Sequence, residues 1–152
     1  RAQVDSAEED LLESFLADSP DGFFDDLRSG AALRLLGRRF RPGPSIVPDY
    51  KGPLFDIYEL AGVVRIRRDR RSRVKRFYFD SASALLLRVR YEDVSRGPKV
   101  SIETRFSQWR DFAGNPLPGQ LERWENGKLV FAFRVASADL LPRGDEGIFR
   151  TP

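Results

Sequence analysis

Apolar residues recur at helical spacing near the start of the chain. Leu11, Leu12, Phe15 and Leu16 form one apolar stripe, and acidic side chains lie opposite them. The segment 6–9, Ser-Ala-Glu-Glu, has the spacing of a capping box, in which a serine and a glutamate three residues later satisfy each other's backbone N–H groups. The pattern therefore predicts an amphipathic helix that begins at about Ser6.

A second helix is predicted after Asp18-Ser19-Pro20, because this segment ends the first helix and caps the next. Phe23, Phe24 and Leu27 face inward in this helix, and Gly30 ends it. The acids in these first turns also suit the positive end of the helix dipole.

After Gly30 the pattern changes to period-two alternation, which is typical of strands. The first strand is predicted to break near Gly37, a Pro- and Gly-rich loop follows at 42–53, and a bulge is expected at Gly62. Asn126-Gly127 is the strongest hairpin signal. The predicted strands cover residues 33–40, 54–66, 73–80, 85–92, 100–111, 120–125 and 128–136.

The predicted strands are apolar on one side and charged on the other. One side carries Leu85, Leu87, Val89 and Tyr91, then Val100, Ile102 and Phe106, then Leu129, Phe131, Phe133 and Val135. The opposite sides carry Arg88, Arg90, Glu92, Glu103, Arg105 and Arg134. Consecutive strands of this kind form an antiparallel meander of about six or seven strands, and the N-terminal helices are expected to cover its apolar face. The predicted fold class is therefore α+β.

Composition excludes several classes of site in this chain. Its 152 residues contain no His and no Cys, so they supply no thiolate nucleophile, Ser-His-Asp triad, zinc cluster or disulfide. The acidic clusters 8–10 and 25–26 are interpreted as capping and solvated residues, because neighbouring helical side chains point in different directions. We expect no enzyme activity, no metal and no cofactor.

Charge is distributed unevenly along the chain. Residues 1–30 hold nine acids and two bases, whereas Arg65–Arg76 hold eight bases and one acid, although the whole chain has a net charge of only +3. The basic block is interpreted as a charged surface for an anionic membrane or an acidic protein partner, or as a solvated strand face, and not as a nucleic-acid site. Trp109 and Trp124 are expected to be half-buried.

Three segments resemble the LolA-like superfamily, which contains outer-membrane lipoprotein-sorting and carrier proteins. Residues 74–89, which contain Phe-Asp-Ser-Ala-Ser-Ala-Leu-Leu, resemble its FD-x-x-T-G-L-L hairpin. Residues 104–118 are similar to its aromatic strand and Gly/Pro turn, and residues 139–152 are similar to its closing motif. The three segments occur in the family's order over the last two-thirds of the chain. Ala84 stands where the family usually has Gly, so a different or slightly strained turn is expected there.

The resemblance implies a strongly curved antiparallel sheet, an unclosed half-barrel, with helices packed on its apolar concave face. Residues 1–152 would be one such domain or its C-terminal part, because the family's N-terminal strands have no counterpart here. Its expected parts are a helical cap (1–30), a strand and loop (31–53), the meander (54–138) and a tail (139–152). The first residue is Arg1 and not Met, which predicts a processed or truncated product. The resemblance also implies the periplasm or cell envelope.

The resemblance implies a non-enzymatic carrier domain for a lipid, an acyl chain or a lipoprotein. The alternative is a structural or interaction module whose sheet packs against the rest of a longer protein. Both use the apolar face, and the first requires a cleft between helices and sheet. The candidate ligand-lining residues are Leu12, Phe15, Phe24, Leu87, Phe106, Phe131 and Phe133.

Overall fold

The structure of the protein is a computed structural model, and it describes residues 6–41, 51–66, 69–94 and 97–137. Most of the predicted loop at 42–53 and the whole predicted tail at 139–152 lie outside these residues. So do Arg67 and Arg68 of the basic block, and the side chains of 65–72 are outside the description as well.

Two helices open the described chain, as the spacing predicts. Helix α1 covers Ser6–Asp18 and helix α2 covers Pro20–Arg28. Ser19 is the N-cap of α2, because its hydroxyl oxygen accepts a hydrogen bond of 3.2 Å from the N–H of Gly22. The chain leaves α2 through Gly30, whose φ of +96° suits glycine.

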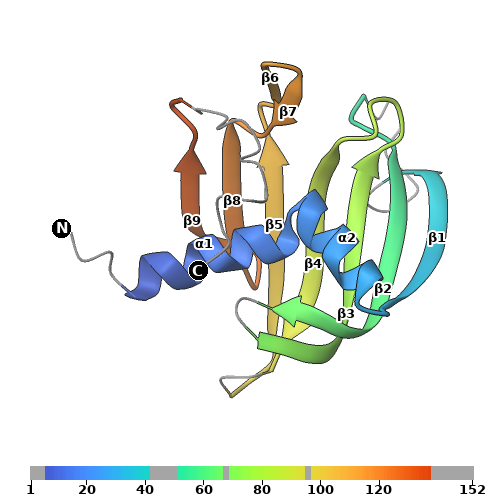
Figure 1. Ribbon diagram of the computed structural model, residues 1–152, viewed down its shortest axis with the longest axis vertical. Helices are drawn as coiled ribbons and strands as arrows, with labels where there is room; N and C mark the ends of the chain where they lie inside the picture. Colours follow the sequence, from blue (N-terminus) through green and yellow to red (C-terminus); the bar gives the residue numbers. More distant parts are fainter. Residues whose placement is uncertain (1–5, 42–50, 67–68, 95–96, 138–152) are drawn as a thin grey trace, which may run out of the picture.

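Seven strands form one open antiparallel sheet in the order β1-β2-β3-β4-β5-β8-β9. Each strand pairs with its neighbour in the chain, except that β5 pairs directly with β8. The small hairpin β6–β7, which comes between them in the sequence, forms a separate two-stranded sheet beyond the end of β5 (Figure 1). The strands are β1 (Ala32–Phe40), β2 (Phe55–Ile66), β3 (Asp69–Asp80), β4 (Leu86–Asp93), β5 (Val100–Ser107), β6 (Arg110–Phe112), β7 (Asn115–Leu117), β8 (Gln120–Glu125) and β9 (Lys128–Arg134). The α+β class and the meander are therefore confirmed.

The turns and the strand break that depend on the backbone preferences of their own residues were predicted correctly. Asn126 and Gly127 have φ values of +49° and +77°, as a type I′ hairpin turn requires. Pairing between β1 and β2 shifts register at Gly37, where a break was predicted. Ala84 has a φ of +59°, so the turn before β4 holds a non-glycine residue in the left-handed region.

Two strand predictions were wrong. The strand expected over 100–111 ends at Ser107, because Gln108 adopts a φ of +54° and its carbonyl accepts a hydrogen bond of 3.0 Å from Gly119. No bulge occurs at Gly62, which pairs with Arg73 in an uninterrupted register between β2 and β3 and has a φ of +118°, a value that suits glycine.

The register shift between β3 and β4 changes which leucine is buried. It occurs after Tyr78, and it turns Leu86 inward, so Leu87 is only half-buried. The prediction that Leu87 shares the buried side with Val89 was therefore wrong, since a register irregularity exchanges the faces of a strand.

Both helices cross one face of the sheet, which we call the helix face; the opposite side is the outer face (Figure 1). Phe23 of α2 packs edge-on against Phe77 and Phe79 of β3 and Tyr58 of β2, with ring centroids 4.8, 5.6 and 6.4 Å away. The buried cluster also contains Ala31, Leu60, Val64, Leu86, Val89, Tyr91, Ile102 and Phe106. Each buried leucine, valine, isoleucine or phenylalanine side chain contributes about 1.5–3 kcal/mol through burial.

The buried side of α1 differs from the predicted apolar stripe. Ser14, Phe15, Ala17 and Asp18 are buried, whereas Leu12 and Leu16 remain 47% and 56% exposed. Ser14 and Asp18 face the sheet because the strands below α1 present charged and hydroxyl side chains to it. Helical spacing shows which residues share a side, but the surface below decides which side is buried.

Candidate functional site

An apolar cleft lies between helix α2 and the neighbouring strands. Its volume is about 390 Å³, which falls within the range of small-molecule sites. Its apolar walls are Phe23, Phe24, Leu27, Leu33, Tyr58 and Phe79. Phe23 and Leu27 are four residues apart on α2, so one helix face supplies both, and strand alternation directs Tyr58 and Phe79 toward that helix. Tyr58 and Phe79 also pack edge-on at 5.8 Å.

The same cleft includes two carboxylates, Asp56 and Asp80. Asp56 accepts hydrogen bonds from the Ser81 hydroxyl at 2.6 Å and from the Arg39 N–H at 3.0 Å. These bonds, the Ser81 bond first, hold the pKa of Asp56 below its ordinary value. A hydrogen bond from the Ser83 hydroxyl likewise lowers the pKa of Asp80. Both groups are therefore negatively charged at neutral pH.

The predicted ligand-lining residues are spread over the helix face. Phe24 lines the apolar cleft. Phe15 and Phe131 contact each other below α1, with ring centroids 5.8 Å apart, and Phe106 is buried beside Trp109. Leu87 is half-buried after the register shift in β4, and Leu12 and Phe133 are exposed. The structure thus does not gather these seven residues into one cavity.

A buried polar cluster lies below α1, and sequence reasoning missed it. Lys75 donates hydrogen bonds to the Asp18 carboxylate at 2.6 Å and to the Ala17 carbonyl at 3.1 Å. Asp18 also accepts a bond of 2.7 Å from the Thr104 hydroxyl. Arg123 donates to the Ser14 hydroxyl. The lysine and aspartate are completely buried.

Tyr91 joins the two halves of this cluster. Its ring lies 5.0 Å from the Lys75 ammonium nitrogen, and its phenol group hydrogen-bonds with Ser14 and Arg123. Burial raises the pKa of Tyr91 well above its ordinary value, and the charge of Asp18 adds to this effect. Because these side chains satisfy one another largely away from solvent, the cluster anchors α1 to the sheet.

The chain carries signals that would have revealed both features. Lys75 alternates with Phe77 and Phe79, so its side chain has to share their buried face. The same alternation directs Asp56 toward the side of Tyr58. Lys75 also corrects the interpretation of Arg65–Arg76 as a charged surface, since this member of the block is buried.

The outer face carries charge and aromatic rings. Arg76, Arg88, Arg90 and Arg105 project from it, together with Glu59 and Glu103. Trp124 lies there, with the Arg105 guanidinium carbon 4.2 Å from its ring centroid. Trp109 instead packs against Phe106 in the buried cluster, so the two tryptophans do not form one surface.

Comparisons of the chain with protein-family models, with curated proteins and with solved structures find no match. Among the described residues, no helix is both long and apolar enough to span a membrane. The same part of the chain holds no group of three or more His, Cys, Asp or Glu residues able to bind a metal ion.

Proposed function

We propose that this chain is a non-enzymatic domain that binds one alkyl or acyl chain of an amphiphile in the apolar cleft between α2 and the sheet. The observation that carries the proposal is the cleft itself, with aromatic and leucine walls and a volume of about 390 Å³. Phe24 lines the cleft and is about half exposed, so its ring offers apolar surface that a bound alkyl chain would cover.

The LolA-like resemblance supports the same proposal. In that arrangement a strongly curved half-barrel carries its ligand on an apolar concave face below helices, in the periplasm or cell envelope. The proposal therefore includes that curvature and that location, with a lipid or lipoprotein chain as the cargo.

A structural or interaction module is the second candidate function. It is favoured by Leu12 and Leu16, which lie one helical turn apart on α1 and are both about half exposed. In this alternative the exposed leucines contact another protein, and the cleft takes up no separate ligand.

Displacement of the neutral dye Nile red by dodecanol tests the proposal. Phe24→Asp should weaken dodecanol binding about tenfold or more, because it places a charge in the apolar wall. Phe40→Asp is the matched control: Phe40 is 53% exposed and Phe24 is 54% exposed, but Phe40 lies on the edge strand β1 outside the cleft walls. It should bind as the unchanged protein does.

Two results would contradict the proposal. One is an equal loss in both variants, which would mean that the ligand does not occupy the cleft. The other is the absence of saturable binding in the folded, unchanged protein, and this result would leave the interaction module standing.

A further inference from the structure

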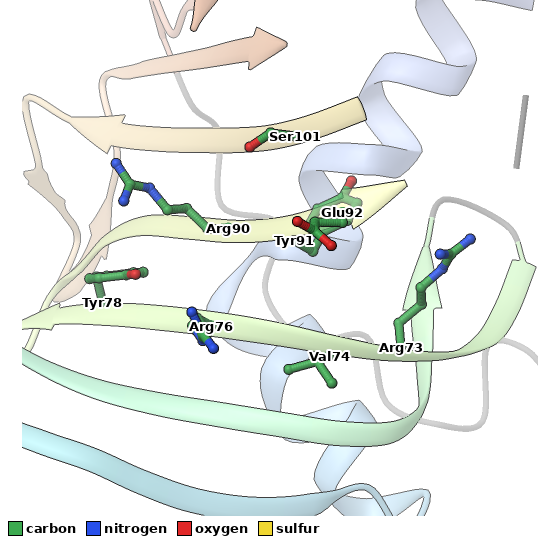
Figure 2. Close-up of a pocket in the computed structure, with 8 residues that line it drawn as sticks. All are labelled: Arg73, Val74, Arg76, Tyr78, Arg90, Tyr91, Glu92 and Ser101. Carbon is green, nitrogen blue, oxygen red and sulfur yellow. The ribbon is translucent and has the colours of Figure 1, made fainter. Parts of the chain in front are cut away.

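A second hollow lies on the other side of the sheet, where strands β3 and β4 separate. Their backbone pairing ends at Lys75 and Tyr91, whereas β3 continues to pair with β2 as far as Asp69. The hollow has a volume of about 520 Å³. Figure 2 shows its lining side chains, which come from three neighbouring strands; they include Arg73, Arg76, Tyr78, Arg90, Glu92 and Ser101. We call it the basic hollow.

Two arginines occupy directly opposite positions on the two strands of this seam. Arg76 of β3 and Arg90 of β4 are direct partners in the register. Like charges in such a position repel each other, so the pair is unfavourable unless something negative lies near it. The next residues in the same row are Glu59, beside Arg76 on β2, and Glu103, beside Arg90 on β5.

Each arginine binds a glutamate on its far side. The Nε–H of Arg76 donates to Glu59 at 3.1 Å, and the Nε–H of Arg90 donates to Glu103. These two carboxylates therefore lie outside the seam and hold the guanidinium groups in place. Hydrogen bonds and charges from arginines keep the pKa of both glutamates low, and at Glu103 they outweigh the effect of burial. The arrangement is thus charged at neutral pH.

Further donors surround the seam. The Arg90 guanidinium carbon lies 5.5 Å from the ring centroid of Tyr78, which places the tyrosine beside the arginine pair. Ser101 contributes a hydroxyl group. Among the described residues, the buried Nε of Arg73 has no hydrogen-bond partner, although its terminal nitrogen lies 3.4 Å from Asp93. Glu92 is the acid in the lining, and Lys99 pairs with it at 2.6 Å.

We propose that the basic hollow binds a phosphate group. Paired guanidinium groups recognise phosphate oxygens through charge-assisted hydrogen bonds, and the tyrosine and serine hydroxyls add neutral donors. The hollow is large enough for a phosphate with its attached group, either a soluble phosphomonoester or the headgroup of an anionic phospholipid. The site lies on the outer face, so this inference is independent of the apolar cleft.

Titration calorimetry with sn-glycerol 3-phosphate and co-sedimentation with phosphatidylglycerol vesicles test the two sources, with glycerol and phosphatidylcholine vesicles as neutral controls. Arg90→Gln should weaken binding about tenfold, because it removes a charged donor from the seam. Arg105→Gln is the matched control, because it removes the same charge. Native Arg105 also pairs with Glu103, but its guanidinium group lies over Trp124, outside the hollow. The effect of Arg105→Gln should stay within about threefold.

The proposal is supported if either probe binds and Arg90→Gln weakens that binding more than Arg105→Gln does. The probe that binds shows whether the phosphate belongs to a soluble phosphomonoester or to a phospholipid headgroup. Equal losses in both variants would show unspecific attraction to a basic face and would overturn it. Failure of both probes to bind the unchanged protein would overturn it as well. Thermal unfolding of each variant checks its fold, and Glu103 keeps two arginine partners in both.

Discussion

Lys75 and Asp18 form an ion pair that water does not reach. Their exposed fractions are both 0%, and the ammonium nitrogen lies 2.6 Å from the carboxylate oxygen. Removing two charges from water costs several kcal/mol each, and this cost is offset only when the remaining hydrogen bonds are made. The bonds from Thr104 and to the Ala17 carbonyl provide them here. The pair therefore positions α1 more than it adds net stability.

Lys75→Met should lower the free energy of unfolding by about 3–5 kcal/mol, because it leaves Asp18 buried without its counter-charge. The matched control is Lys99→Met. Lys99 forms an ion pair of the same length with Glu92, but at the exposed surface, so its loss should cost about 1 kcal/mol or less. Urea unfolding of both variants measures the difference.

The double variant Asp18→Leu/Lys75→Met completes this experiment. It should recover part of the loss, because no unpaired charge then remains in the cluster. Similar small losses in the Lys75 and Lys99 variants would mean that α1 does not close over the pair.

At the scale of elements, the corner between α1 and α2 depends on a close backbone approach. A Cβ atom at Gly22 would lie 2.5 Å from the Ala17 carbonyl oxygen and 2.7 Å from that of Leu16. These oxygens belong to the last turn of α1, next to Asp18. A side chain at position 22 would therefore push the end of α1 away from the sheet.

Gly22→Ala should lower the free energy of unfolding by about 1–3 kcal/mol, although alanine is favoured over glycine inside a helix by about 1 kcal/mol. Thermal or urea unfolding measures this value. Gly37→Ala is the control, since its nearest neighbour would be a flexible Phe40 side-chain atom 3.9 Å away. It should change stability by no more than about 0.5 kcal/mol. A stabilising effect at Gly22 would refute the close approach.

Elements governed by local chemistry could be predicted from the sequence, and the site could be predicted only in part. Asn126-Gly127 and Ser19-Pro20 specify a turn and a helix start through their own backbone preferences. The exposure of Leu12 could not be predicted, because it depends on which strand residues lie below α1. The pairing of Arg76 with Arg90 depends on the turn that contains Ala84 and on the register shift that follows. Neither feature follows from the alternation of apolar residues.

At the scale of the whole molecule, the two proposed sites differ in the charge of their side chains. The outer face carries clustered arginines, whereas the apolar cleft carries Asp56 and Asp80, and the chain as a whole has a net charge of +3. Long-range attraction therefore favours anions, but the cleft itself favours a neutral or cationic headgroup beside its alkyl chain. The two proposed sites consequently select ligands of opposite charge.

Dodecylamine should bind in the apolar cleft about three- to tenfold more tightly than dodecanol at pH 7, because the two aspartates attract the ammonium group. The pKa values of Asp56 and Asp80 are both lowered from their ordinary value, the first chiefly by the Ser81 hydrogen bond and the second chiefly by the Ser83 hydrogen bond, so both carboxylates are charged between pH 5 and pH 7. Protonation neutralises them as the pH falls through these lowered pKa values. The affinity ratio should therefore hold between pH 5 and pH 7 and approach one at still lower pH, as measured by Nile red displacement.

Asp56→Asn should reduce this ratio at pH 7 while the amide still accepts the Ser81 hydrogen bond, and dodecanol affinity should stay the same. Asp111→Asn is the control. Like Asp56, Asp111 accepts a hydrogen bond from a backbone N–H, that of Gly114, but it is exposed on β6 outside the cleft walls. Equal binding of amine and alcohol at pH 7 would show that the headgroup does not reach Asp56 and Asp80. The net positive charge of the chain opposes amine binding, so a preference for the amine that Asp56→Asn reduces and Asp111→Asn leaves unchanged would come from the carboxylates near the bound headgroup.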